Sequence, residues 1–128
     1  MYFDYICKIN KAICNNEFEL RYTDCFGIFD KYINIACNEI EDHWILYNSM
    51  KVCALIKLYQ PFYDGNHRTA LIVFGDLISS KGFTFDYVSA LNDMANRKLN
   101  IPTIYSEEDE IGSFDKWFKY ISKPEMKL

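Results

Sequence analysis

Two apolar segments separated by a short polar stretch constrain the fold of this chain more than any other feature. The first covers residues 52–56 and the second covers residues 70–78. The first is apolar on nearly every side, which indicates a buried central helix. The second has the composition of a buried strand, but its length and the glycine that closes it, Gly82, favour a helix. We therefore expect an all-α fold with two central helices flanking residues 59–69.

The polar stretch between the two segments contains the ingredients of an anion-binding site. Gly65 tolerates a positive φ, so a tight turn fits there, and Pro61 ends the helix before it. The first turn of the following helix presents unpaired N–H groups and the positive end of the helix dipole, which together bind phosphate. Arg68 adds a planar guanidinium suited to phosphate oxygens. Asp64 is a hard oxygen ligand for Mg²⁺ beside those phosphates.

This stretch resembles the signature of the Fic/Doc (Fido) family, H-x-F-x-[D/E]-G-N-x-R. The matching positions, at the family's spacing, are Phe62, Asp64, Gly65, Asn66 and Arg68. The continuation through residues 69–71 and the glycine that closes the next helix are similar to the Doc-like branch. The clear resemblance covers residues 55–85, roughly a quarter of the chain. It implies a Fic-like helical domain, although a fold alone does not establish chemistry.

Three positions depart from the family pattern. Gln60 stands where the family has the histidine that takes the proton from the target hydroxyl, and glutamine has no titratable group for that role. Leu71 stands where many AMP-transferring members carry a second arginine, which the Doc-like branch commonly lacks as well. His67 stands where glycine or lysine is usual, and its imidazole is compatible with a phosphate contact. The first departure puts catalysis in doubt, whereas the second points to a subfamily.

The resemblance implies a ligand, which is ATP or another nucleoside triphosphate with Mg²⁺. Its phosphates would lie on the amides of residues 65–68, and Asp64 would hold the metal. The implied nucleotide-binding residues are Gly65, Asn66, His67 and Arg68, and the implied catalytic positions are Gln60 and Arg68. A serine, threonine or tyrosine hydroxyl of a target protein would then receive AMP, or phosphate as in the Doc-like branch. The resemblance also allows an antitoxin partner, which small Doc-like proteins commonly have.

Three interpretations of Gln60 stay open at this point. The chain is a Fic-like transferase with weak or lost activity, because the missing base contributes a factor of about 10²–10⁴. Alternatively, it is a pseudoenzyme that binds a nucleotide or a partner without chemistry. In the third interpretation, glutamine is an engineered, inactivating substitution at this position.

Each candidate residue also has an ordinary structural explanation when taken singly. The sequence of residues 64–66 suits any tight turn. Arg68 and His67 suit an exposed helix surface, and Phe62 is expected in the core in either case. The functional interpretation depends on five residue types at fixed spacing between two apolar segments.

Composition limits the class of protein. The 128 residues suit one domain, residues 1–128, with a substantial core. A net charge of −4 argues against nucleic acid as a partner. No apolar run is long enough to cross a membrane, and the N-terminus lacks the pattern of a signal peptide. The five cysteines are dispersed, which is typical of reduced thiols packed in a cytoplasmic protein.

Helical spacing and capping residues predict further helices around the two central ones. The expected helices cover about residues 2–14, 25–40, 43–59, 70–78, 86–99 and 106–123. Asp24, Asp86 and Ser106 are the expected N-terminal caps of the second, fifth and last helices. Gly75 costs about 1 kcal/mol of helix propensity relative to alanine, and we expect it to let the central helices approach closely.

Residues 17–23 alternate apolar and polar side chains, which is a strand pattern. One interpretation is an ordered loop that places three side chains on the core. The other follows the resemblance: a short β-hairpin flap beside the site, which pairs with an extended target segment.

A second family pattern, that of an inhibitory helix, is [S/T]-x-x-x-E-[G/N]. Ser106 and Glu110 fit its first part, but Ile111 replaces the final residue. We interpret the match as the start of an ordinary capped helix, because several acidic residues make it easy to obtain by chance.

Overall fold

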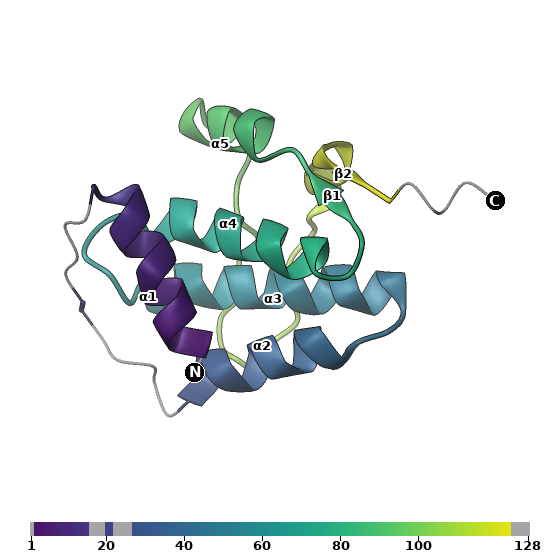
Figure 1. The fold of residues 1–128 in the computed structure, drawn as a ribbon, viewed down its shortest axis with the longest axis horizontal. Helices are drawn as coiled ribbons and strands as arrows, with labels where there is room; N and C mark the ends of the chain where they lie inside the picture. The colour runs from purple at the N-terminus through teal and green to yellow at the C-terminus, as the bar shows by residue number, and fades with distance from the viewer. Residues whose placement is uncertain (1, 16–19, 22–26, 124–128) are drawn as a thin grey trace.

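The computed structural model describes residues 2–15, 20–21 and 27–123, which form helices and one small sheet (Figure 1). The α-helices are α1 (Tyr2–Ile13), α2 (Ile28–Asn38), α3 (Asp42–Tyr59), α4 (Asn66–Ser79) and α5 (Tyr87–Ala95). The remaining elements are the 3₁₀ helix η2 (Asp115–Tyr120) and the strands β1 (Thr84–Phe85) and β2 (Ile121–Ser122). In Figure 1, α3 and α4 run side by side through the centre and α1 crosses one end of the pair. The expected all-α class is confirmed.

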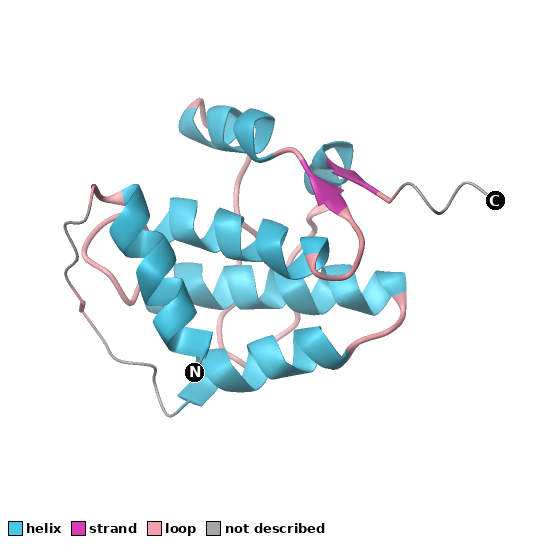
Figure 2. Ribbon diagram, viewed as in Figure 1, coloured by secondary structure: helices cyan, strands magenta, loops and turns pink. Residues whose placement is uncertain are grey.

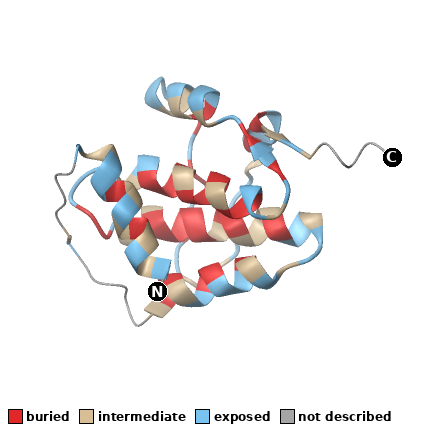
Figure 3. Cartoon of the chain, in the orientation of Figure 1, coloured by how far each residue is buried: buried red, intermediate tan, exposed pale blue. Residues whose placement is uncertain are grey.

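The helices α3 and α4 form the core because apolar residues surround each of them. All side chains of residues 52–56 are fully buried, as are those of Leu71 and Phe74 in α4. Figure 3 shows buried positions concentrated along these two helices. The predicted bounds of α3 are correct within one residue. The helix α4 begins at Asn66, ahead of its apolar segment, because the polar residues 66–69 form its first turn.

The helices α1 and α2 pack against the central pair. The predicted end of α1 is confirmed, and its Ile6 is fully buried. The helix α2 ends at Asn38, two residues earlier than predicted, because Glu39 has extended backbone angles. Its expected cap Asp24 and its expected first residue lie outside the described residues. The cysteines at positions 14, 37 and 53 are free thiols, as predicted.

The chain after α4 differs most from the prediction. The strand β1 pairs antiparallel with β2, from the far end of the chain, with Phe85 opposite Ile121 (Figure 2). The helix α5 begins at the predicted cap, where Asp86 accepts a hydrogen bond from the Ser89 amide, but it ends at Ala95. The predicted last helix is wrong, because residues 106–114 contain only turns and irregular backbone before η2. The inhibitory-helix pattern therefore falls on a segment that is not helical.

Two packing predictions are also corrected. A Cβ atom at Gly75 would lie 2.4 Å from Tyr87 Cε1 and 2.6 Å from Phe85 Cδ2. This glycine therefore makes room for the rings of β1 and α5, and the expected close approach of the central helices is not its role. On α5, helical spacing predicts an inward stripe of residues 88, 91, 94 and 95, but Val88 is 79% exposed. Among the described residues, no helix is long and apolar enough to span a membrane.

Candidate functional site

The predicted turn connects the two central helices. The helix α3 ends at Tyr59, and the next residue, Gln60, has a left-handed backbone with φ of 46° and ψ of 63°. Gly65 is also left-handed, with φ of 75°, and α4 begins at the next residue. Phe62 lies between them and is fully buried, as predicted. The turn is thus anchored by one core side chain and bounded by two positive φ angles, of which only the glycine's is free of steric cost.

The side chain of Asn66 fixes the shape of the turn. Its Oδ1 accepts a hydrogen bond from the Phe62 amide at 3.0 Å, and its Nδ2 donates one to the Phe62 carbonyl at 2.7 Å. Both ends of the carboxamide are therefore engaged with the backbone of the loop. What Asn66 presents to a ligand in this conformation is its own backbone amide, because the first amides of a helix have no carbonyl four residues earlier in the helix.

Asp64 and Arg68 lie on the outer side of the turn. The Asp64 carboxylate accepts a hydrogen bond from the Gly65 amide at 2.8 Å. Its other oxygen lies 3.7 Å from Arg68 Nη2, in an ion pair whose side chains are 82% and 48% exposed. The Gly65 amide is thus already hydrogen-bonded to the Asp64 carboxylate, so the amides of residues 66–68 are the ones that an external anion would contact. The first helical bond of α4 runs from the Thr69 amide to the Gly65 carbonyl at 2.9 Å.

All the predicted site residues line one open pocket of about 300 Å³. Its lining residues are Gln60, Tyr63, Asp64, Gly65, Asn66, His67 and Arg68. Among these lining residues, Tyr63 was not a predicted site residue, and it is 64% exposed. The pocket has the volume expected of a small-ligand site.

A short segment of the chain lies along the turn opposite α4. The Arg21 amide donates to the Pro61 carbonyl at 2.7 Å, and Leu20 forms an antiparallel bridge with Phe62. Arg21 Nη1 also lies 3.4 Å from Gln60 Oε1. The predicted strand or flap at residues 17–23 lies mostly outside the described residues. Its two described residues do pair with the backbone of the turn.

A second pocket of about 460 Å³ adjoins the first, and His67 lines both. Its other lining residues are Lys57, Met94, Ala95, Arg97, Leu99, Asn100 and Ile101. Burial, and secondarily the positive charge of Lys57, lowers the pKa of His67 below its ordinary value of 6.5. The imidazole is therefore neutral at pH 7, so it offers a hydrogen bond rather than a charge. A bound phosphate would raise that pKa again.

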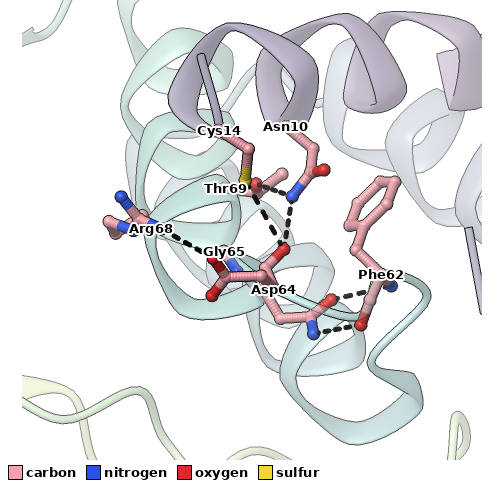
Figure 4. Close-up of polar contacts among 8 residues, drawn as sticks. Asn10, Cys14, Phe62, Asp64, Gly65, Arg68 and Thr69 are labelled. Atoms are coloured by element: carbon pink, nitrogen blue, oxygen red, sulfur yellow. Dashed lines mark hydrogen bonds and ion pairs between the residues drawn. The ribbon is translucent and has the colours of Figure 1, made fainter. Parts of the chain in front are cut away.

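Asn10 of α1 and Cys14, the residue after its end, contact the turn and were missed by the sequence analysis. Figure 4 shows both side chains pointing toward the backbone of Asp64. Asn10 Nδ2 donates to the Asp64 carbonyl at 2.7 Å and to Thr69 Oγ1 at 3.2 Å. A signal was present in the sequence, since Asn10 is a polar residue within the apolar stripe of Ile6 and Ile13. A buried asparagine needs hydrogen-bond partners.

Asp64 is the candidate metal ligand. Within the described parts of the chain, no three His, Cys, Asp or Glu side chains gather as a metal cage. One exposed carboxylate at the edge of an anion-binding turn fits Mg²⁺, which commonly takes one or two protein carboxylates and completes its shell with phosphate oxygens and water. It does not fit a tightly held structural metal, which needs a full set of protein ligands.

The fold and the pocket together define an all-α protein with a polar site at the N-terminus of its second central helix. Comparisons of the chain with protein-family models, with curated proteins and with solved structures gave no match.

Proposed function

We propose that this chain is a Fic/Doc-like protein that binds a nucleoside triphosphate with Mg²⁺ at the turn between α3 and α4. It would transfer AMP, or phosphate, to a serine, threonine or tyrosine hydroxyl of a target protein, at a rate lowered by Gln60. The observation that carries the proposal is that Gln60 and residues 63–68 all line the same pocket at the start of α4. The resemblance of this stretch to the family signature supplies the reaction class.

The phosphates would be bound by the first amides of α4 and by Arg68. The amides of residues 66–68 and the helix dipole favour an anion there. Arg68 is half exposed and its ion pair with Asp64 is long, at 3.7 Å, so the guanidinium can turn to a phosphate at little cost. His67 would donate or accept a hydrogen bond. The adjoining pocket beyond His67 has room for the remainder of the nucleotide.

Mg²⁺ would be held by Asp64 together with the phosphates, and it would neutralise charge on them when bound. Metal binding would compete with the contacts that the Asp64 carboxylate now makes to Arg68 and to the Gly65 amide. The guanidinium and the amide would then be available to the same phosphates.

Gln60 makes a binding-only protein the second candidate. Its carboxamide lines the pocket, where it can donate or accept a hydrogen bond but cannot take a proton from a hydroxyl. Its oxygen already accepts from Arg21 at 3.4 Å. In this alternative the pocket holds a nucleotide, or part of a partner protein, without reaction.

Calorimetry with Mg-ATP tests binding directly. We expect the wild-type chain to bind and Arg68→Ala to weaken binding by about 10–100-fold, the range for a hydrogen bond to a charged group. Lys116→Ala, which removes an exposed cation from η2, is the matched control and should leave the affinity unchanged. Absence of binding by the wild-type chain, or equal affinity of the Arg68 variant, would exclude a phosphate-binding turn.

Gln60→His tests the chemistry. Restoring the base should raise the labelling of proteins in a host extract by about 10²–10⁴-fold, measured with ATP or another labelled nucleotide. If this variant binds Mg-ATP with the wild-type affinity and labels nothing, the binding-only alternative is favoured.

A further inference from the structure

Asn10 connects α1 to both sides of the site turn. Its side chain is 1% exposed, and its Nδ2 donates to the Asp64 carbonyl at 2.7 Å and to Thr69 Oγ1 at 3.2 Å. Asp64 is the last residue before the left-handed Gly65, and Thr69 is the residue whose amide makes the first helical bond of α4. The carboxamide of Asn10 therefore contacts one residue before and one residue after the candidate anion-binding amides, which are those of residues 66–68.

The packing of α1 on Gly65 is equally close. A Cβ atom at Gly65 would lie 3.0 Å from Asn10 Nδ2 and 3.1 Å from Cys14 Sγ. The glycine is thus favoured twice, once by its φ of 75° and once because a Cβ atom there would contact Asn10 and Cys14 more closely than is usual. The hydrogen bond of Asn10 to the Asp64 carbonyl ties the turn to α1.

The helix α1 is held in place by contacts that do not involve Asn10. The ring of Phe3 stacks on Phe29 with centroids 5.6 Å apart and on Phe62 at 6.4 Å. Tyr5 donates a hydrogen bond to Asp76 of α4. A change at position 10 should therefore alter the turn while α1 stays docked.

We propose that Asn10 is a positioning residue for the anion-binding turn. By fixing the Asp64 carbonyl and the Thr69 hydroxyl, it sets the direction of the amides of residues 66–68 and keeps the Asp64 carboxylate at the mouth of the pocket. It lines no part of the pocket itself. Its effect on a ligand rests on the proposed function, whereas its effect on the turn does not.

Two variants and a matched control separate positioning from general stability. Asn10→Asp keeps the shape but replaces the donor, so an oxygen faces the Asp64 carbonyl. Asn10→Ala removes both hydrogen bonds. Tyr5→Phe is the control, since it removes a different polar contact of α1 with α4, at Asp76, away from the turn.

The first measurement is amide hydrogen exchange by NMR, without any ligand. In both Asn10 variants we expect exchange of the Thr69 amide to accelerate by about tenfold or more relative to core amides of α3. In Tyr5→Phe the exchange at Thr69 should follow the change in global stability. Equal acceleration in the Tyr5 and Asn10 variants, or none in the latter, would overturn the positioning role.

The second measurement is the affinity for Mg-ATP by calorimetry. We expect about tenfold weaker binding in Asn10→Ala, an equal or larger loss in Asn10→Asp, and wild-type affinity in Tyr5→Phe. If the wild-type chain binds no Mg-ATP, the proposed function fails while exchange at Thr69 still decides the role of Asn10. If it binds and the Asn10 variants bind equally well, the positioning role fails while the proposed function stands.

Discussion

The two sides of α4 are held by different kinds of contact. On one side lie α3 and the turn, where consecutive residues such as 52–56 are fully buried and the helical backbone is continuous. On the other side lie β1, α5, η2 and β2, where short elements alternate with irregular backbone. There α5 buries only Ala90, and η2 is attached by Trp117 and Tyr120.

This difference indicates which contacts hold the site in place. The turn is bounded by two long helices and covered by α1, so its position depends on many buried contacts acting together. The later segment is attached through side chains of short elements, such as the buried Trp117, whose Nε1 donates to the Asn100 carbonyl at 3.0 Å. We expect a substitution near the turn to cost more free energy of unfolding than the same substitution in the later segment.

The largest expected effect compares one substitution on the two sides. Phe62→Ala should lower the free energy of unfolding by about 3–5 kcal/mol, since it removes a fully buried ring. Phe118→Ala, in η2, removes a ring that is 46% exposed and should cost less than about 1 kcal/mol. Urea denaturation followed by circular dichroism measures both. Equal losses would mean that the two sides are equally well packed.

The side that carries the turn was largely predictable from the sequence. The apolar residues 52–56 predicted the helix α3, and Pro61 predicted where it ends. Gly65 and Pro61 indicated the turn, and the residues around them indicated the pocket. These are local signals, because each comes from a few neighbouring residues and needs no knowledge of the rest of the chain.

The later segment was not predictable in the same way. Apolar spacing predicted a helix over residues 106–123, but long-range contacts determine the structure there. Trp117 Nε1 donates to the Asn100 carbonyl and the hydroxyl of Tyr120 donates to Asp93, at sequence separations of 17 and 27 residues. Asn10 was missed for the same reason, since its partners are more than fifty residues away in the sequence.

The second prediction concerns the junction between α4 and α5. Tyr87 donates a hydrogen bond to Asp76 Oδ1 at 2.6 Å, so Tyr87→Phe should cost about 1.5 kcal/mol at neutral pH. Burial, followed by this hydrogen bond, raises the pKa of Tyr87 from 10.0 to about 12. The native state thus holds the proton more tightly than the unfolded chain, so this stabilisation is complete below pH 10 and declines as the pH rises toward 12.

Denaturation between pH 9 and pH 12 checks this sign. The wild-type chain should lose stability more steeply than Tyr87→Phe over that range. Burial also raises the pKa of Tyr5, which acts in the same direction, so Tyr5→Phe combined with Tyr87→Phe should flatten the profile further. Parallel profiles for all variants would show that ionisation of Tyr5 and Tyr87, the two tyrosines that contact Asp76, does not change the free energy of unfolding.

The third prediction tests how closely the two sides meet at Gly75. Alanine there gains about 1 kcal/mol of helix propensity. Its Cβ would lie 2.4 Å from Tyr87 Cε1, and relieving such overlap costs about 1–3 kcal/mol. We expect a net loss of about 1 kcal/mol by urea denaturation. A stabilised variant would mean that the later segment moves aside easily, which would sharpen the contrast between the two sides.

The smallest expected effect concerns the end of the described chain. Lys123 Nζ lies 2.6 Å from Asp42 Oδ1 at the start of α3, with side chains 16% and 38% exposed. Partly exposed ion pairs contribute little, so Lys123→Ala should cost about 0.5 kcal/mol. Because salt screens such pairs, the difference from wild type should shrink in 1 M sodium chloride. Lys116→Ala, another lysine of the later segment, should cost less at low salt. A loss above about 2 kcal/mol for Lys123→Ala would show that Lys123 contributes strongly to holding the later segment on α3. The contrast between the two sides would then be weaker than their packing indicates.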